Sequence, residues 1–307
     1  MVDSAGAAAA VGVEGPSSIA TRAAERRLPL RLAVGLLLLG VNWGLYWSVV
    51  TVWSHGLFFG LWLGYVLTVD GLVHRRTGTS LLDRGAGAFV LAFAVSVPFW
   101  WVFEWCNWVT RNWSYTLPVP MGRTTDVLMF SLTFSTVFPA LLETAELLRS
   151  TRVFRGPWQG RGLPLQRVPI WCATGLGVLA LAGMLLLPRQ LFPFVWIFPL
   201  LILDPVNSRL GRPSLWQQTS VGRWRLAALL AGTGLVCGFF WEMWNSRTTG
   251  EHWQYFLPSF LSHPHLFAMP LPGYLGYPPF AASAYACYQT LCALVPPLAE
   301  AAPDLAG

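Results

Sequence analysis

Long apolar runs set the strongest constraint on how this chain folds. Eight segments are long and apolar enough to cross a bilayer, or nearly so. They lie at 29–50, 54–73, 86–106, 125–148, 168–187, 190–205, 224–245 and 270–295. Only 11% of the residues are charged, whereas a soluble domain carries about a quarter. We therefore predict an all-α, polytopic membrane protein with about eight transmembrane helices.

The arginines predict how these helices are oriented. The sequence has no lysine, so arginine supplies all 20 basic side chains. Four lie on one side of the predicted topology, at Arg111, Arg123, Arg189 and Arg247, and the other sixteen lie on the opposite side. Because cytoplasmic loops carry an excess of arginine and lysine, we expect both termini in the cytoplasm and the protein in the inner membrane. The net charge of +6 thus reflects topology, and no nucleic-acid partner is expected.

Two blocks of sequence occur twice in the same order. "LTVDGLVHRRTGTSLL" (67–82) matches "LILDPVNSRLGRPSLW" (201–216), and "EWCNWVTRNWSYTLP" (104–118) matches "EMWNSRTTGEHWQYFLP" (242–258). We predict a tandem repeat of four helices plus four. An even number of helices per repeat gives both halves the same orientation, about a pseudo-twofold axis along the membrane normal.

The repeat divides the chain into five parts. We expect a disordered cytoplasmic tail over 1–27 and a first membrane repeat over 28–148. An arginine-rich cytoplasmic linker follows over 149–167, then a second repeat over 168–296 and a flexible tail over 297–307.

Paired carboxyl and amide residues end the third and seventh apolar segments. Glu104 and Asn107 are one helical turn apart, and Glu242 and Asn245 repeat the spacing. An ionisable group near hydrocarbon is costly and is by default a functional candidate. We predict Glu104 and Glu242 as catalytic proton donors, each held by a hydrogen bond from its asparagine.

Aromatic residues surround these carboxyl groups and are predicted to bind ligand. They are Trp105, Trp113, Tyr115, Trp241, Trp253 and Tyr255. Aromatic faces stabilise a cation by roughly 0.5–2 kcal/mol, which suits chemistry on a polyene or another isoprenoid. The alternative is structural: tryptophan and tyrosine gather at membrane interfaces in any case, and the two motifs then only fix outer loops.

Three further acidic positions are candidates. Asp70 and Asp204 each precede an arginine, Arg75 or Arg209, by five residues. These pairs either fix a helix end or form a site for an anion such as a diphosphate or a lipid headgroup. Glu143 lies deeper in the fourth segment and is a candidate ligand contact. The sequence indicates no metal site and identifies no cofactor.

The second half also resembles a known family, the membrane lycopene β-cyclase domain of two-subunit bacterial and fused archaeal and fungal carotene cyclases. The resemblance covers roughly 60–148 and 195–295. It is carried by Trp241–Glu242, Trp253 and Tyr255, Met269–Pro270–Leu271, Pro279–Phe280, and Tyr285 with Tyr288. It implies a helical membrane domain, duplicated in the fused enzymes, that acts on a carotenoid.

One departure from the family bears on catalysis. The family's Pro-Leu-Glu-Glu motif supplies its essential acids, whereas this chain reads "MPLPGYLG", with Pro272 and Gly273 where the glutamates stand. If this chain catalyses the family's reaction, Glu104, Glu242 or Glu143 would have to act as the acid.

We expect a protein that binds or modifies a carotenoid or other polyprenoid lipid by redox-neutral acid–base chemistry, such as cyclisation or hydration. Two alternatives stay open: a transporter or channel with carboxylates near the pseudo-twofold axis, and a non-catalytic membrane scaffold.

Overall fold

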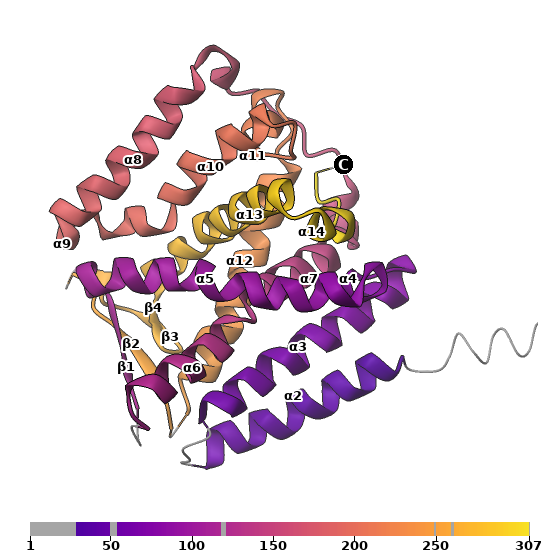
Figure 1. Cartoon of the computed structure of the whole chain (residues 1–307), viewed down its shortest axis with the longest axis vertical. Helices are drawn as coiled ribbons and strands as arrows, with labels where there is room; N and C mark the ends of the chain where they lie inside the picture. The colour runs from indigo at the N-terminus through magenta and orange to yellow at the C-terminus, as the bar shows by residue number, and fades with distance from the viewer. Residues whose placement is uncertain (1–28, 50–53, 118–120, 249, 259–260, 307) are drawn as a thin grey trace, which may run out of the picture.

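The structure, a computed structural model, describes residues 29–49, 54–117, 121–248, 250–258 and 261–306. Helices make up most of these residues, and two small sheets lie at one end of the helices (Figure 1). The predicted disordered tail over 1–27 falls outside the described residues.

Each of the eight predicted segments contains helix. The longer helices are α2 (Leu30–Ser48), α3 (Ser54–Thr77), α5 (Ala86–Thr110), α6 (Arg123–Phe134), α7 (Val137–Arg149), α8 (Ile170–Leu186), α10 (Phe198–Arg209), α12 (Arg225–Asn245) and α13 (Tyr277–Leu294). The short ones are α4 (Leu81–Arg84), η1 (Arg152–Arg155), η2 (Pro164–Arg167), α9 (Pro188–Leu191), η3 (Phe192–Trp196), α11 (Leu215–Ser220), η5 (Leu271–Gly276) and α14 (Pro296–Ala301). The strands are β1 (Trp113–Thr116), β2 (His252–Tyr255), β3 (His265–Leu266) and β4 (Met269–Pro270).

Six helical stretches in the described part of the chain are long and apolar enough to cross a membrane. They are α2, α3, α5, α6 together with α7, the stretch from α9 to α10, and α12. This is the architecture expected of a multi-pass membrane protein. Helix α8 is apolar but has only 17 residues, so the number of spans stays a prediction.

The prediction of an all-α fold is wrong in one respect. Strand β1 pairs with β2, and β3 pairs with β4, each pair forming a two-stranded antiparallel sheet. Both β1 and β2 follow the end of a long helix and are rich in aromatic residues, which favour strands. The hydrophobic patterns of the long helices dominate the sequence and conceal these four-residue strands.

Helix α2 lies along α3 on the outside of the fold (Figure 1). The two helices approach closely at glycines: a Cβ on Gly35 would lie 2.5 Å from the amide nitrogen of Thr68, and one on Gly64 would lie 2.5 Å from that of Leu39. Small residues permit such close packing between membrane helices. The rest of α2 exposes leucine and valine side chains, as a helix in contact with lipid does.

Large aromatic side chains fill the core between the central helices. Trp62 of α3, Phe103 of α5, Phe138 of α7, Trp244 of α12 and Phe280 of α13 are all fully buried. They come from both halves of the sequence, so a continuous core joins the halves. This core also forms the floor of the candidate site described below.

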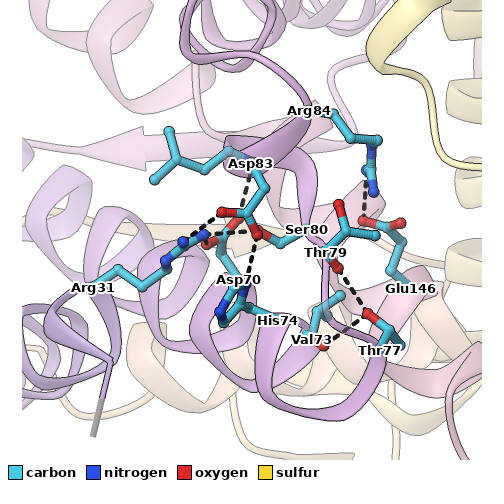
Figure 2. A network of polar contacts seen from close by, with 11 residues as sticks. Arg31, Asp70, Val73, His74, Thr77, Thr79, Ser80, Asp83, Arg84 and Glu146 are labelled. Carbon is cyan, nitrogen blue, oxygen red and sulfur yellow. Dashed lines mark hydrogen bonds and ion pairs between the residues drawn. The ribbon is translucent and has the colours of Figure 1, made fainter. Parts of the chain in front are cut away.

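A polar network lies where α3 meets α4 (Figure 2). The guanidinium of Arg31 donates 2.8 Å hydrogen bonds to Asp70 and Ser80 and forms a 2.5 Å ion pair with Asp83. His74 also contacts Asp83, at 2.7 Å. Since Asp70 is fully buried, Arg31 supplies the charge that compensates its carboxylate.

Asp204 occupies a matching place before α11. Its two carboxylate oxygens accept hydrogen bonds from the backbone nitrogens of Leu215 and Trp216, at 3.0 and 2.6 Å. Asp70 does the same for α4, accepting from the backbone nitrogen of Leu82 at 3.1 Å. Both aspartates thus satisfy amide groups that the first turn of a helix leaves without partners.

The predicted pairings of Asp70 with Arg75 and of Asp204 with Arg209 are therefore wrong. Both arginines are exposed, while the aspartates are buried and bonded elsewhere. A helix places residues five apart on different faces, so each arginine points away from its aspartate. The described residues do not assemble the predicted diphosphate or headgroup site.

The C-terminal segment differs from the predicted flexible tail. Helix α14 and the residues after it pack on the fold, with Leu298 and Leu305 buried. Arg84 donates a 2.8 Å hydrogen bond to the carbonyl of Ala301, and Arg225 donates one of 3.1 Å to that of Ala306. The leucines of this alanine-rich segment give it an apolar face, and that face packs against the core.

Replacing Arg31 by methionine is expected to lower the free energy of unfolding by about 3 kcal/mol, because it leaves the buried Asp70 carboxylate without its counter-charge. The exposed Arg75→Met on α3 is the matched control and should change it by no more than about 0.5 kcal/mol. Thermal or denaturant unfolding in detergent micelles measures both. Equal shifts in the two variants would contradict this role of Arg31.

A second prediction concerns acid stability. Burial raises the pKa of Asp83, but hydrogen bonds from Arg31, His74 and Ser80 outweigh it and hold that pKa well below its usual range. The carboxylate therefore stabilises the fold above pH ~4, where Asp83 of the unfolded chain is ionised, and this contribution is lost as the pH falls below that value. Asp83→Asn should be less stable than wild type at pH 7, and the difference should shrink in acid. A difference that stays constant with pH would contradict the prediction.

Candidate functional site

Glu104 lies near the end of α5 and is held by aromatic donors. One oxygen, Oε1, accepts hydrogen bonds from the indole nitrogens of Trp100 and Trp113, at 2.9 and 3.2 Å, and from the hydroxyl of Tyr115 at 2.6 Å. Trp100 is one helical turn before the carboxyl group, and the other two donors come from β1. The end of α5 and the strand after it thus form one unit around the carboxyl group.

Glu242 repeats this arrangement at the end of α12. Its Oε1 accepts a 2.7 Å hydrogen bond from the hydroxyl of Tyr255 and a short one from that of Tyr277. Trp253 in turn donates to the Tyr255 hydroxyl at 2.7 Å. Glu242 is fully buried, and its second oxygen, Oε2, has no hydrogen-bond partner among the described residues.

The tyrosines act as donors in both units. Burial, and then the neighbouring carboxylate, raises the pKa of Tyr115 and of Tyr255 well above the usual value. Both phenols therefore keep their protons at neutral pH. The phenol donors of the second unit bond only Oε1 of Glu242 and leave its Oε2 without a partner among the described residues.

The two asparagines hold the strands that follow the helices. Asn107 accepts hydrogen bonds from the backbone nitrogens of Asn112 and Trp113 and donates one of 2.9 Å to the carbonyl of Trp113. Asn245 accepts from and donates to the backbone of Trp253, at 2.9 and 2.8 Å. Each side chain thus fixes the following strand. Asn107 also interacts with the Glu104 carboxyl group, as predicted, whereas the donors to Glu242 are tyrosine hydroxyls.

The two strands meet in one antiparallel pair. Trp113 lies opposite Tyr255, and Tyr115 lies opposite Trp253. Trp113 and Trp253 are matching positions of the two halves, and so are Tyr115 and Tyr255. A twofold axis between the strands would produce this register, because it would place each residue where its match in the other half lies. The pairing brings the donors of both glutamates to the same end of the protein.

A single cavity lies beside this sheet and receives side chains from both halves. Its volume is about 90 Å³, well above the ~10–15 Å³ that one water molecule requires. Most of the wall is aromatic: Tyr46, Phe58, Trp100, Trp113, Tyr115, Phe130, Phe134, Trp196, Trp241, Trp253, Tyr255, Tyr277 and Phe280. Glu242 and Glu251 are the carboxyl groups in the wall.

The structure gathers some of the predicted site residues and separates others. Trp113, Tyr115, Trp241, Trp253 and Tyr255 all line the cavity with Glu242. Glu104 lies behind its donors Trp100, Trp113 and Tyr115, which form part of the wall.

Trp105, a predicted ligand contact, does not line this cavity. Its side chain is 49% exposed, because it sits one residue after Glu104 and so projects from another face of α5. The exposed side of α5 is the place for interfacial tryptophan, which was the alternative interpretation.

Glu143 is buried in α7 and does not line the cavity. Both of its carboxyl oxygens are without hydrogen-bond partners among the described residues. It interacts electrostatically with Asp70 and Glu146. The structure therefore places Glu143 apart from the wall that holds Glu242, and its predicted ligand contact stays a prediction.

Several wall residues escaped the sequence analysis. Trp100 carried a signal, since it precedes Glu104 by one helical turn. Tyr277 lies 35 residues after Glu242 and begins α13, so nothing local connects the two. The same holds for Glu251, which pairs with His55 across the fold.

The arrangement suits proton transfer to an apolar ligand. Glu242, a buried acid with one oxygen that lacks a hydrogen-bond partner, lines a cavity whose aromatic faces stabilise positive charge. No group of three or more metal-binding side chains occurs among the residues that the structure describes.

No protein-family model, no curated protein and no solved structure matches this chain.

Asn245→Ala is expected to lower the free energy of unfolding by about 1–3 kcal/mol, because it leaves buried backbone groups of Trp253 without partners. Gln254→Ala is the matched control on the exposed side of the same strand and should cost at most ~0.5 kcal/mol. Unfolding in detergent compares the variants. Equal stability of Asn245→Ala and wild type would show that β2 does not depend on this side chain.

Proposed function

We propose that this is an integral membrane protein that binds a carotenoid or another polyprenoid lipid and modifies it by redox-neutral acid–base chemistry, either cyclisation or hydration. One observation carries the proposal: Glu242, a buried carboxyl group whose Oε2 has no hydrogen-bond partner among the described residues, lines an aromatic cavity. Protonating an alkene needs an acid, and the resulting carbocation needs a dry wall that is rich in π electrons.

The position of Glu242 also fits the departure from the cyclase family. Gly273 stands where that family carries an acid, and Gly273 lines the same cavity as Glu242. A Cβ at Gly273 would lie 2.3 Å from the sulfur of Met269, so a larger side chain does not fit there without rearrangement. In this proposal Glu242 delivers to the cavity the proton that a family glutamate delivers from the other wall.

We further propose that the chain is a tandem 4+4 repeat whose halves share one orientation, with both termini in the cytoplasm. The supporting observations are the matching hydrogen bonds of Asn107 and Asn245, the matching caps of Asp70 and Asp204, and the symmetric register of β1 and β2. One cavity then belongs to both halves, and neither half holds a complete site.

The test compares apolar lipid extracts by mass spectrometry. A native host strain that lacks the gene is complemented with wild type, Glu242→Gln or Glu300→Gln, the last being an exposed glutamate on α14. Wild type and Glu300→Gln should restore the polyprenoid product. Glu242→Gln should lower it at least ~100-fold, the usual contribution of a general acid, while an acyclic or unhydrated precursor accumulates.

Immunoblots and thermal unfolding of each variant serve as controls for protein amount and folding. An identical lipid profile with and without the gene would overturn the proposal. Restoration by Glu242→Gln would show that the cavity acts without this acid, as the scaffold and transporter alternatives expect.

A further inference from the structure

A third carboxylate belongs to the cavity wall. Glu251 lies between α12 and β2 and is 6% exposed. Its Oε2 is 2.8 Å from Nδ1 of His55, an ion-pair distance, although the contact lacks hydrogen-bond geometry. His55 is in the first turn of α3 and is 3% exposed. A buried histidine–carboxylate pair thus joins two segments that lie far apart in the sequence.

First-half side chains hold this pair against the cavity. The Tyr46 hydroxyl donates a 3.0 Å hydrogen bond to the carbonyl of Glu251. The His55 ring meets Phe130 edge to face, at 4.7 Å between centroids, and Phe130 lines the cavity. Glu251 is therefore fixed at the wall, and its contact His55 is not among the lining residues.

The first half does not repeat this carboxylate. The residue two positions before Trp253 is Glu251, whereas the residue two positions before Trp113 is Arg111, which is exposed. The cavity therefore has two carboxyl groups in its wall, and both come from the second half. Their surroundings differ: Glu242 receives hydrogen bonds from uncharged phenols, and Glu251 faces an imidazole.

We propose that Glu242 and Glu251 are the acid and the base of one proton-transfer pair, with His55 as the residue that positions Glu251. The assignment rests on the proposed function. It follows from the unlike environments, since a buried carboxyl group among uncharged phenols suits the acid and one beside an imidazole suits the carboxylate base.

The proton balance closes within this pair. Glu242 gives its proton to a terminal C=C bond of the polyene, and a tertiary carbocation forms. The π electrons of a second double bond form the new ring C–C bond and move the positive charge into the ring. Glu251 removes a proton from the neighbouring carbon, and the electrons of that C–H bond become the ring double bond. Water then returns a proton from Glu251 to Glu242, and no oxidant or reductant is consumed.

The experiment follows deuterium. Membranes from strains that carry wild type, Glu242→Gln, Glu251→Gln or Glu300→Gln are incubated in D₂O with the apolar lipid extract of the strain that lacks the gene. Mass spectrometry then reads products and label. Wild type and Glu300→Gln should form product with one deuterium for each ring closed. Glu242→Gln should form no product and incorporate no label.

Glu251→Gln should separate the two steps. Cyclised product should fall at least ~100-fold, while deuterium still enters recovered precursor or a hydrated derivative, because protonation continues and water captures the cation. Glu251→Asp keeps a carboxylate base and should recover part of the cyclised product. This recovery would show that the loss in Glu251→Gln is not caused by misfolding. His55→Gln should displace Glu251 and slow the second step, so that less product forms while deuterium still enters recovered precursor.

The outcomes distinguish the two proposals. Absence of label with wild-type membranes overturns the proposed proton chemistry itself. If Glu242→Gln loses the deuterium label but Glu251→Gln forms product at the wild-type rate, only the assignment of Glu251 as the base is overturned. Loss of both label and product in Glu251→Gln also overturns it, since a base acts after the proton has been added.

Discussion

Pairing of β1 with β2 is the contact on which the rest of the site depends. Each strand follows a long helix, and each is fixed to that helix by one asparagine. When the strands pair, the ends of α5 and α12 are held at a set separation. Left unpaired, the backbone groups of the two strands would need other hydrogen-bond partners. The pairing gives the backbone groups of both strands hydrogen-bond partners. It also places Trp113, Tyr115, Trp253 and Tyr255 in the cavity wall.

The polar groups of the protein divide into two sets with different consequences. At the α3–α4 junction, Asp70 and Asp83 are matched by Arg31 and by backbone donors, so that every charge has a compensating partner. At the sheet end, Glu242 keeps an oxygen without one. Compensated charges fix a structure, whereas a buried polar atom without a partner raises the free energy until a ligand or water contacts it. This contrast separates Asp70 and Asp83 from Glu242.

The sequence was informative wherever function rests on local spacing. Apolar run lengths located the helices, and the repeated Glu-x-x-Asn motif located both carboxyl groups and the strands after them. It was misleading where a partner came from elsewhere in the chain. Arg75 was the nearest arginine to Asp70 along the sequence, but Arg31 of the neighbouring helix reaches it in space. Likewise Tyr277 and His55 reach their glutamates only through the packing of α13 and α3.

A single cavity with unlike walls imposes an order on any ligand that has two identical ends. One end at a time can meet Glu242 and Glu251, because the first half offers Arg111 in place of a second such base. The other end of the molecule must remain in the bilayer during that event. Under the proposed function, alteration of both ends requires release, reversal in the lipid and rebinding. The half-altered lipid of that proposal is then a free species in the membrane, open to any other enzyme there.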